Sequence, residues 1–190
     1  YDLLLGLEYT PLRKEFWGNN VNVGQKSKTG VLVTIGAQDF DEISIRVLEL
    51  LLKWFPQYSY HVVLGFHDFG EKLTPYQKNK GVTFYYSLNA EEMRDLMLTC
   101  WVAVSAAGQT SYELARVGIE MVLIQVADNQ RFNMRGWAEL GYIDSFIEVS
   151  NLSKLKAAFS RKVNEKKSLP RISGDGVRNI VRTVLEQVVA

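Results

Sequence analysis

The stretch of sequence that decides the fold lies at residues 101–114 and reads WVAVSAAGQTSYEL. Its first four residues are apolar and Ser105 follows, which predicts a buried β-strand over 101–105. Residues 110–117 have the spacing of a helix, and the turn between the two contains two alanines and a glycine before Gln109. A strand that leads through a short turn directly into a helix is the unit from which parallel α/β sheets are built.

The same alternation of strand and helix repeats along the chain. Further strands are predicted at 31–35, 60–64, 82–86 and 120–126. One helix is predicted to start at Asp39 or Asp41, either of which can cap it, and to end at Phe55. Further helices are predicted at 90–98, 129–140, 151–165 and 174–189. Because the strands are apolar throughout, helices must cover both faces of the sheet. The predicted fold class is therefore α/β, with a doubly wound, Rossmann-like parallel sheet.

The composition excludes several classes of protein. Hydrophobic residues make up 47% of the 190, charged residues 23%, and the net charge is +1. No apolar run approaches the ~20 residues that a membrane span needs, so no transmembrane segment is predicted. The single cysteine, Cys100, cannot form an internal disulfide and is expected to be buried, which favours a cytoplasmic location. The basic residues of 151–190 alternate with apolar ones at helical spacing, so we interpret them as a solvated face and expect no nucleic-acid partner.

The ends of the chain differ from its middle. Residues 1–25 show no clear periodicity and are interpreted as an interdomain arm, while 26–190 form one domain. The chain starts at Tyr1 and is expected to be part of a longer protein. The last helix carries an apolar stripe, and it either packs on this domain or bridges to a domain that is missing from the chain.

The turn at 105–110 is the strongest candidate for a ligand site. In doubly wound sheets ligands bind beyond the carboxyl ends of the strands. The amides at a helix start attract an anion such as a diphosphate, and Glu113, one turn later, can accept both hydroxyls of a ribose. Thr110 to Glu113 also fits a capping box, in which Glu113 only satisfies a backbone amide, and the spacing does not decide between the two. Gly108 lacks the neighbours of a dinucleotide fingerprint or a P-loop, which argues against a nicotinamide dehydrogenase or a P-loop ATPase.

Other loops at this edge give weaker signals. Residues 36–39 (GAQD) join a strand to a helix, and 128–130 (DNQ) offer side-chain amides that suit sugar hydroxyls. Each also fits a strand exit or a helix cap. His61 lies in a strand and is interpreted as structural, whereas His67 follows that strand and is a candidate base by position alone. The two histidines and one cysteine have no metal-binding spacing, so no metal is predicted.

Four segments, in this order, resemble a known family: YTPLR at 9–13, TIGAQD at 34–39, SAAGQTSYEL at 105–114 and ADNQ at 127–130. They are similar to the C-terminal half of the UDP-sugar hydrolases of pseudaminic acid biosynthesis. The related spore-coat polysaccharide biosynthesis proteins share the pattern. More distantly, the chain resembles the C-terminal domain of the peptidoglycan N-acetylglucosaminyltransferase, which has the GT-B fold. The resemblance is more specific for this superfamily than for the reaction.

The resemblance implies roles for individual residues. The diphosphate of a UDP-sugar would be held by Gly108, Gln109 and Thr110, and its ribose by Glu113. The sugar would be contacted by Asn129 and Gln130, and the cleft would be lined by Gly36. The uracil would lie beside Tyr85 and Tyr86. No further cofactor is implied. The family's catalytic histidine belongs to the N-terminal half, so no catalytic residue is assigned in this chain. Family members commonly have glycine where this chain has Ala37 and Ala107, and each added methyl group is expected to hinder the approach of phosphate.

Three functions remain open at this stage. The leading hypothesis is the UDP-binding domain of a hydrolase that releases UDP from a UDP-deoxy-amino sugar. The first alternative is the donor-binding domain of a glycosyltransferase in surface polysaccharide biosynthesis. The second is a non-catalytic module that binds a sugar nucleotide or a partner. In the first two cases the missing N-terminal domain is the partner, and this chain alone is expected to be inactive.

Overall fold

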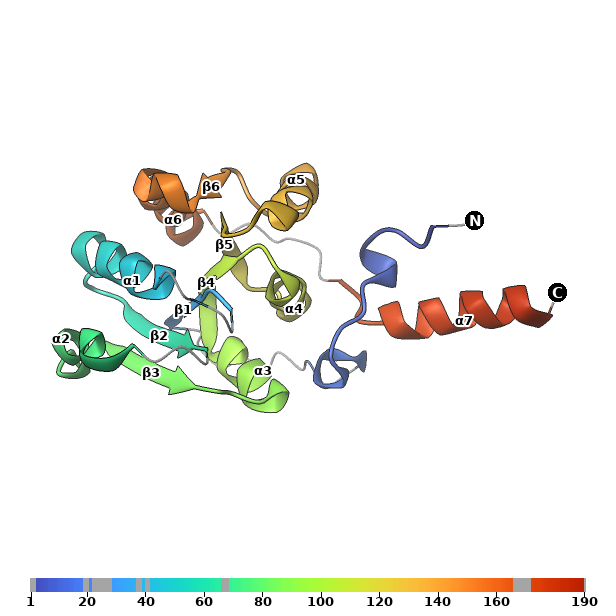
Figure 1. Ribbon diagram of the computed structural model, residues 1–190, viewed down its shortest axis with the longest axis horizontal. Coiled ribbons are helices and arrows are strands. Elements are labelled where there is room, and N and C mark those ends of the chain that lie inside the picture. Colours follow the sequence, from blue (N-terminus) through green and yellow to red (C-terminus); the bar gives the residue numbers. More distant parts are fainter. Residues whose placement is uncertain are drawn as a thin grey trace.

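The computed structural model describes residues 3–18, 21, 29–36, 39, 42–65, 69–165 and 172–189. Its centre is one parallel sheet in the order β3-β2-β1-β4-β5-β6 (Figure 1). The strands are β1 (Gly30–Thr34), β2 (Ser59–Leu64), β3 (Val82–Tyr86), β4 (Cys100–Ala106), β5 (Glu120–Gln125) and β6 (Ile147–Glu148). The order runs in opposite directions on either side of the β1–β4 pair, which makes the loops after these two strands the place where ligands bind in such sheets. The predicted doubly wound parallel sheet is confirmed.

The helices follow the strands as the sequence predicts. They are α1 (Ile43–Trp54), α2 (Thr74–Gln77), α3 (Ala90–Thr99), α4 (Gln109–Val117), α5 (Arg131–Glu139), α6 (Leu155–Asn164) and α7 (Gly176–Val189). Short 3-10 turns are η1 (Leu7–Tyr9), η2 (Lys14–Phe16), η4 (Gly70–Leu73), η5 (Asp128–Gln130) and η6 (Val149–Lys154). The short elements β6, η4 and α2 were not predicted, because segments of two to four residues carry too little periodicity.

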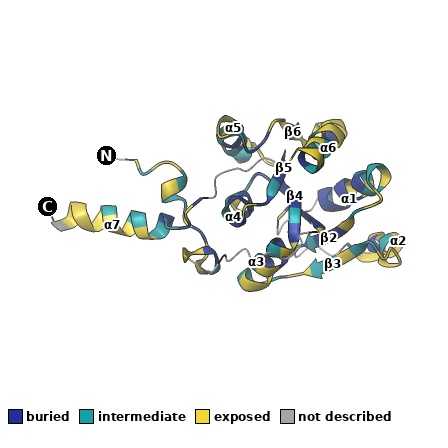
Figure 2. Cartoon of the chain, turned by 180° about the vertical axis from the view of Figure 1, so that it is seen from behind, coloured by how far each residue is buried: buried dark blue, intermediate teal, exposed yellow. Residues whose placement is uncertain are grey.

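The sheet separates two apolar cores. Strand β1 sends alternate side chains to the two faces, as a strand must. Val31 and Val33 pack in the core beneath α1 and α6, whereas Leu32 packs in the core beneath α3, α4 and α5. The central strands are dark blue, and so buried, in Figure 2. Two covered faces explain why β1 is buried at every position.

The arm is packed against the domain over the part that the structure describes. Leu12 and Phe16 are buried in the core beneath α3, α4 and α5. Arg116 of α4 donates to the carbonyl of Phe16 at 2.9 Å, and Asn179 of α7 donates to that of Glu8 at 2.7 Å. This packing holds residues 3–18 in a defined place. The predicted boundary at residue 25, and the role of the arm between two domains, stay predictions.

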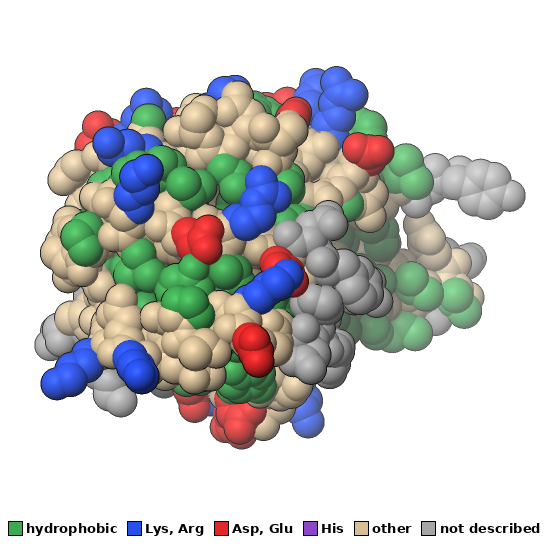
Figure 3. Space-filling model, turned by 60° about the vertical axis from the view of Figure 1, so that its left-hand side comes forward, with side chains coloured by type: hydrophobic (Ala, Val, Ile, Leu, Met, Phe, Trp, Pro, Cys, Tyr) green, Lys and Arg blue, Asp and Glu red, His purple; other side chains and the backbone are tan. Residues whose placement is uncertain are grey.

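The surface carries both signs of charge and one projecting helix. Basic and acidic side chains are interspersed over the face drawn in Figure 3. Helix α7 extends away from the sheet beside the N-terminal segment (Figure 1), and its apolar stripe is largely exposed at Val181, Leu185 and Val188. Among the described residues, no helix combines the length and the apolar character that crossing a bilayer requires.

Candidate functional site

The turn after β1 leads into a helix whose start is occupied by an internal carboxylate. Asp39 is buried, and its Oδ1 accepts a hydrogen bond from the amide of Ile43 at 2.7 Å. Its Oδ2 accepts from the amide of Ser44 at 2.9 Å. A carboxylate here satisfies the first amides of α1 and complements the helix dipole. The prediction of a cap by Asp39 is confirmed, while Asp41 lies outside the described residues.

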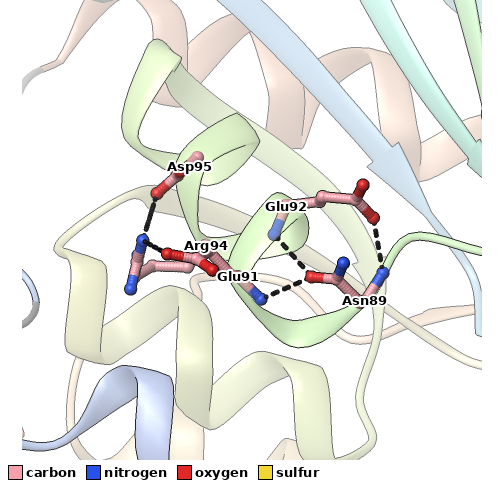
Figure 4. A network of polar contacts seen from close by, with 5 residues as sticks. All are labelled: Asn89, Glu91, Glu92, Arg94 and Asp95. Carbon is pink, nitrogen blue, oxygen red and sulfur yellow. Dashed lines mark hydrogen bonds and ion pairs between the residues drawn. The ribbon is translucent and has the colours of Figure 1, made fainter.

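Helix α3 has an internal cap as well. The Oδ1 atom of Asn89 accepts from the amides of Glu91 and Glu92, at 2.9 and 3.0 Å (Figure 4). The carboxylate of Glu92 in turn accepts from the amide of Asn89 at 2.9 Å, which completes a capping box. The start of this helix is therefore also satisfied by the chain's own side chains.

Helix α4 begins differently. Its N-cap residue is Gly108, which has no side chain, and among the residues that the structure describes no side-chain hydrogen bond caps the helix. The first amides of a helix have no acceptor within it. A Cβ atom at Gly108 would meet only Nε2 of Gln130, at 3.6 Å, so the approach to the turn is open. The capping box suggested for Thr110 and Glu113 does not form, because the helix starts at Gln109 and Thr110 is already within its first turn.

A small cavity lies at the carboxyl ends of β1, β2 and β3. It has a volume of about 190 Å³ and joins Gly36 to Thr110, two of the predicted site residues. The other lining residues are Arg13, Thr34, Val63, Leu64, Gly65, Ser87, Leu88 and Met93. Gly36 has a φ of 119° and Ser87 one of 50°, so both lie in the left-handed region. For serine this conformation is uncommon and is often found at functional sites.

Glu113 is paired with the arm. Its Oε1 accepts from Nε of Arg13 at 2.7 Å, and its Oε2 accepts from Nη2 at 2.8 Å. The Glu113 side chain is 2% exposed and that of Arg13 is 42% exposed. Sequence reasoning quoted Arg13 within a motif and gave it no role, because no local pattern links residues that are a hundred positions apart. The ribose role of Glu113 stays a prediction.

The amide side chains near the α4 start separate into two groups. Gln109 turns toward the arm, where its Nε2 donates to the carbonyl of Pro11 at 2.7 Å. It lines a larger cavity of about 690 Å³ between the arm, α4 and α5. Gln130 stays at the turn, where its Oε1 accepts from the amide of Val126 at 3.0 Å. Asn129 is exposed in η5. The structure thus brings Gln130 to Gly108 and leaves Asn129 at the surface.

Helix α5 supports the turn from behind, which sequence reasoning did not foresee. Asn133 donates from Nδ2 to the carbonyl of Ala107 at 2.9 Å, and the ring of Trp137 donates to Oγ of Ser111 at 2.9 Å. Ser111 itself donates to the carbonyl of Gly108 at 2.6 Å. The bonds from Asn133 and Ser111 therefore engage the carbonyls of Ala107 and Gly108.

Ala107 does not narrow the approach to this turn. It is fully buried, and its methyl group belongs to the core beneath α3, α4 and α5. The expectation that this alanine hinders phosphate was therefore wrong: its side chain faces the core and was taken for one that faces the ligand. Ala37, the other alanine of this kind, lies outside the described residues.

The 190 Å³ cavity is not lined by Tyr85 or Tyr86. The residues that follow them, Ser87 and Leu88, do line it. The hydroxyl of Tyr85 lies 2.9 Å from Nδ1 of His61, in an open cavity of about 740 Å³ beside α3. Burial lowers the pKa of His61 and favours its neutral form. Tyr86 is exposed. Their placement beside uracil stays a prediction, and His67 lies outside the described residues.

Comparisons with known proteins agree with this architecture. No family model matches the chain. A bifunctional protein of Helicobacter pylori, a pseudaminic acid cytidylyltransferase and UDP-2,4-diacetamido-2,4,6-trideoxy-β-L-altropyranose hydrolase, is 25% identical over 189 residues, which is 98% of this chain and 34% of that protein. An uncharacterized protein of Methanocaldococcus jannaschii is 27% identical over 135 residues, 66% of this chain and 28% of that protein.

Two solved structures share the fold. The UDP-GlcNAc 2-epimerase of Neisseria meningitidis, bound to UDP-GlcNAc, superposes with a TM-score of 0.60 at 16% identity, over 86% of this chain and 46% of that one. MurG of Acinetobacter baumannii gives a TM-score of 0.56 at 14% identity, over 95% and 55%. The chain has the Rossmann-like fold of GT-B proteins. The resemblance to a pseudaminic acid pathway hydrolase is likewise confirmed.

The position of the site in the sheet and the length of the chain both agree with one Rossmann-like unit of a GT-B protein. The turn after β4 lies beside the β1–β4 junction, where the strand order reverses. In GT-B terms this chain is one Rossmann-like unit, and it spans about a third of the length of the curated relatives it matches. The remaining length of these relatives is therefore sufficient for a second domain that would form the other half of a two-domain cleft.

The described part of the site offers hydrogen-bond donors and no metal cluster. Within the described ranges, no group of three or more His, Cys, Asp or Glu side chains is arranged to hold a metal ion. Cys100 is buried at the start of β4, far along the strand from its carboxyl end. Near this edge of the sheet the described residues provide the start of α4 at Gly108 and one cation, Arg13, on the wall of the 190 Å³ cavity.

Proposed function

We propose that this chain binds the UDP portion of a UDP-sugar and serves a hydrolase that releases UDP from a UDP-deoxy-amino sugar. One observation carries the proposal: α4 starts without a side-chain cap, at Gly108, beside the point where the strand order of the sheet reverses. An uncapped helix start of this kind binds phosphate through its amides and its dipole. The identity to the Helicobacter pylori hydrolase supports the substrate class.

The proposed residue roles combine this arrangement with those that the resemblance implies. The amides of Gly108, Gln109 and Thr110 hold the diphosphate, and Gly36 lines the cleft. Glu113 serves the ribose, Asn129 and Gln130 the sugar, and Tyr85 and Tyr86 the uracil. When water attacks the anomeric carbon, the bond to the diphosphate oxygen breaks and the oxygen gains negative charge. Helix-start amides stabilise that charge and so favour UDP as a leaving group.

We propose that the base which activates the water lies outside this chain. His61 is held against Tyr85 beside α3, away from Gly36 and Gly108, and its pKa is lowered by burial. General base catalysis contributes about 10²–10⁴-fold to a rate, and positioning of the nucleophile contributes more. A chain that supplies neither is expected to bind UDP with turnover near the uncatalysed rate.

A glycosyltransferase uses the same half of the cleft. The fold is shared with a glycotransferase of kitacinnamycin, with a TM-score of 0.54 at 21% identity. In that alternative the donor site is unchanged, and the acceptor replaces water. The alternatives therefore differ in the partner domain and agree on UDP binding.

The test combines binding with turnover. Millimolar UDP should raise the melting temperature of the purified chain more than NADH or ATP does, since a ligand that binds the folded state stabilises it by mass action. UDP release from UDP-sugars by the chain alone should stay near background, with a full-length homologue as positive control. Absence of any UDP-induced shift would contradict the nucleotide assignment. Turnover within about tenfold of the control would contradict a base outside the chain.

A further inference from the structure

A buried series of hydrogen bonds runs from α5 to the turn before α4. The indole Nε1 of Trp137 donates to Oγ of Ser111 at 2.9 Å, and Ser111 donates in turn to the carbonyl of Gly108 at 2.6 Å. Ser111 is fully buried and Trp137 is 2% exposed. An indole can only donate, so the serine oxygen accepts from it, and the single serine proton is left for the carbonyl. The direction of each bond in the series is therefore fixed.

A second side chain of α5 holds the preceding carbonyl. Nδ2 of Asn133 donates to the carbonyl of Ala107 at 2.9 Å, and its Oδ1 accepts from the hydroxyl of Tyr112 at 3.0 Å. The side-chain amide of Asn133 thus has a partner at each end, which holds its plane in one orientation. Helix α5 therefore holds two successive carbonyls of the turn, that of Ala107 directly and that of Gly108 through a serine.

Each of these carbonyls belongs to the same peptide group as the next amide. A trans peptide group is planar, and its C=O and N–H bonds point in opposite directions. None of the described peptide bonds is cis. Holding the carbonyl of Ala107 therefore sets the direction of the Gly108 amide, and holding the carbonyl of Gly108 sets that of the Gln109 amide. These are two of the three amides that we propose for the diphosphate.

The glycine at the start of α4 makes such a hold from outside the turn important. Glycine loses more conformational freedom than any other residue when its backbone is fixed, and Gly108 has no side chain that could restrain the turn. Its carbonyl accepts from the amide of Ser111 at 3.0 Å as well as from the hydroxyl. Hydrogen bonds that share a peptide group polarise one another, so an engaged carbonyl makes the N–H of the same group a better donor. The contacts with Ser111 thus orient and strengthen the donor at Gln109.

We propose that Ser111, held by Trp137, is a positioning residue for the diphosphate of UDP, and that Asn133 has the same role one peptide group earlier. This inference rests on the proposed binding of UDP and deepens it. In this role the three side chains do not touch the diphosphate, because each acts through the peptide group that it holds. Amides that are oriented before the ligand arrives lose less entropy on binding, which raises affinity.

The experiment measures the affinity of the whole chain for UDP and for uridine, by NMR titration, in Ser111→Ala. Uridine lacks the phosphates, so it separates a change at the diphosphate from a general change in the fold. Tyr60→Phe is the matched control. It also removes a buried hydroxyl that donates to a backbone carbonyl, that of Phe55 at 2.6 Å, but Tyr60 lies near the amino end of β2 and not at the turn.

Ser111→Ala should bind UDP about threefold to tenfold more weakly, on the scale of one hydrogen bond, and uridine within about twofold of the unchanged chain. Tyr60→Phe should lose a similar free energy of unfolding and keep both affinities within about twofold. Asn133→Ala should weaken UDP binding as Ser111→Ala does, and the two losses should add because they concern different peptide groups. Trp137→Phe should also weaken UDP binding, and should add little once Ser111 is already Ala.

Three kinds of result would overturn the inference. An unchanged UDP affinity in Ser111→Ala or Asn133→Ala would show that the carbonyl which it releases does not matter for the ligand. Equal losses for UDP and uridine, or an equal loss in Tyr60→Phe, would reduce the effect to the stability of the fold. Full additivity of Trp137→Phe and Ser111→Ala would show that the indole does not act through the serine. If the unchanged chain does not bind UDP, the proposed function fails first, and the inference fails with it.

Discussion

The turns that follow β1 and β4 lead from buried strands into helices at the same edge of the sheet. After β1, Asp39 occupies the start of α1 with both carboxylate oxygens. After β4, Gly108 leaves the start of α4 without a side-chain cap, while Asn133 and Ser111 hold the carbonyls of the turn. Two turns of similar appearance in the sequence thus differ in what satisfies their amides. In our proposal the first arrangement serves stability and the second binds the ligand.

The largest effect is expected when α4 is given the cap that α1 has. Gly108 has extended backbone angles of −93° and −158°, and a Cβ atom there meets only an ordinary contact, so Gly108→Asp fits without strain. The carboxylate should cap α4 and repel phosphate, which lowers UDP affinity on the order of a hundredfold and leaves stability equal or raised. Titration calorimetry and thermal melting measure the two quantities.

Gly108→Ala is the matched control for that variant. It adds a methyl group without a hydrogen-bond acceptor or a charge, so UDP affinity should fall much less than in Gly108→Asp. If both variants lose affinity equally, steric exclusion explains the result, and the electrostatic comparison between the two turns does not hold.

The second effect concerns the β1 turn. Asp39→Ala removes two hydrogen bonds from buried amides of α1 and should lower the free energy of unfolding by about 2 kcal/mol. UDP affinity of the folded variant should stay within about threefold of the original. Denaturant unfolding measures the loss, and Asp39→Asn, which keeps one acceptor oxygen, should show a smaller one. A large loss of affinity with unchanged stability would make Asp39 a ligand residue.

The sequence predicts the strands and helix caps of this comparison well, and the contacts between distant residues less well. Strand β1 was recognisable from its run of β-branched and apolar residues, and Asp39 because a carboxylate precedes a helical pattern. The pairing of Glu113 was not recognisable, since its partner Arg13 comes from an arm without periodicity. Tyr85 and Tyr86 were assigned to one ligand although neighbouring strand residues face opposite sides, and the structure separates them.

The smallest effect tests the alanine of the β4 turn. Ala107→Gly removes a buried methyl group and adds backbone freedom in the unfolded chain, so the free energy of unfolding should fall by about 1 kcal/mol. UDP affinity should change little, because the methyl group lies in the core. Unfolding and calorimetric titration on the same sample decide this. A clear gain in affinity would show that the methyl group does hinder the ligand.

The central claim is that UDP binds at the uncapped start of α4. Backbone amide chemical shifts of the ¹⁵N-labelled chain, followed during titration with UDP, test it residue by residue. The account predicts the largest shifts at the amides of Gly108, Gln109 and Thr110, with those of Ile43 and Ser44 nearly unchanged because Asp39 already occupies them. Large shifts at Ile43 and Ser44 with none at Gly108 would contradict it.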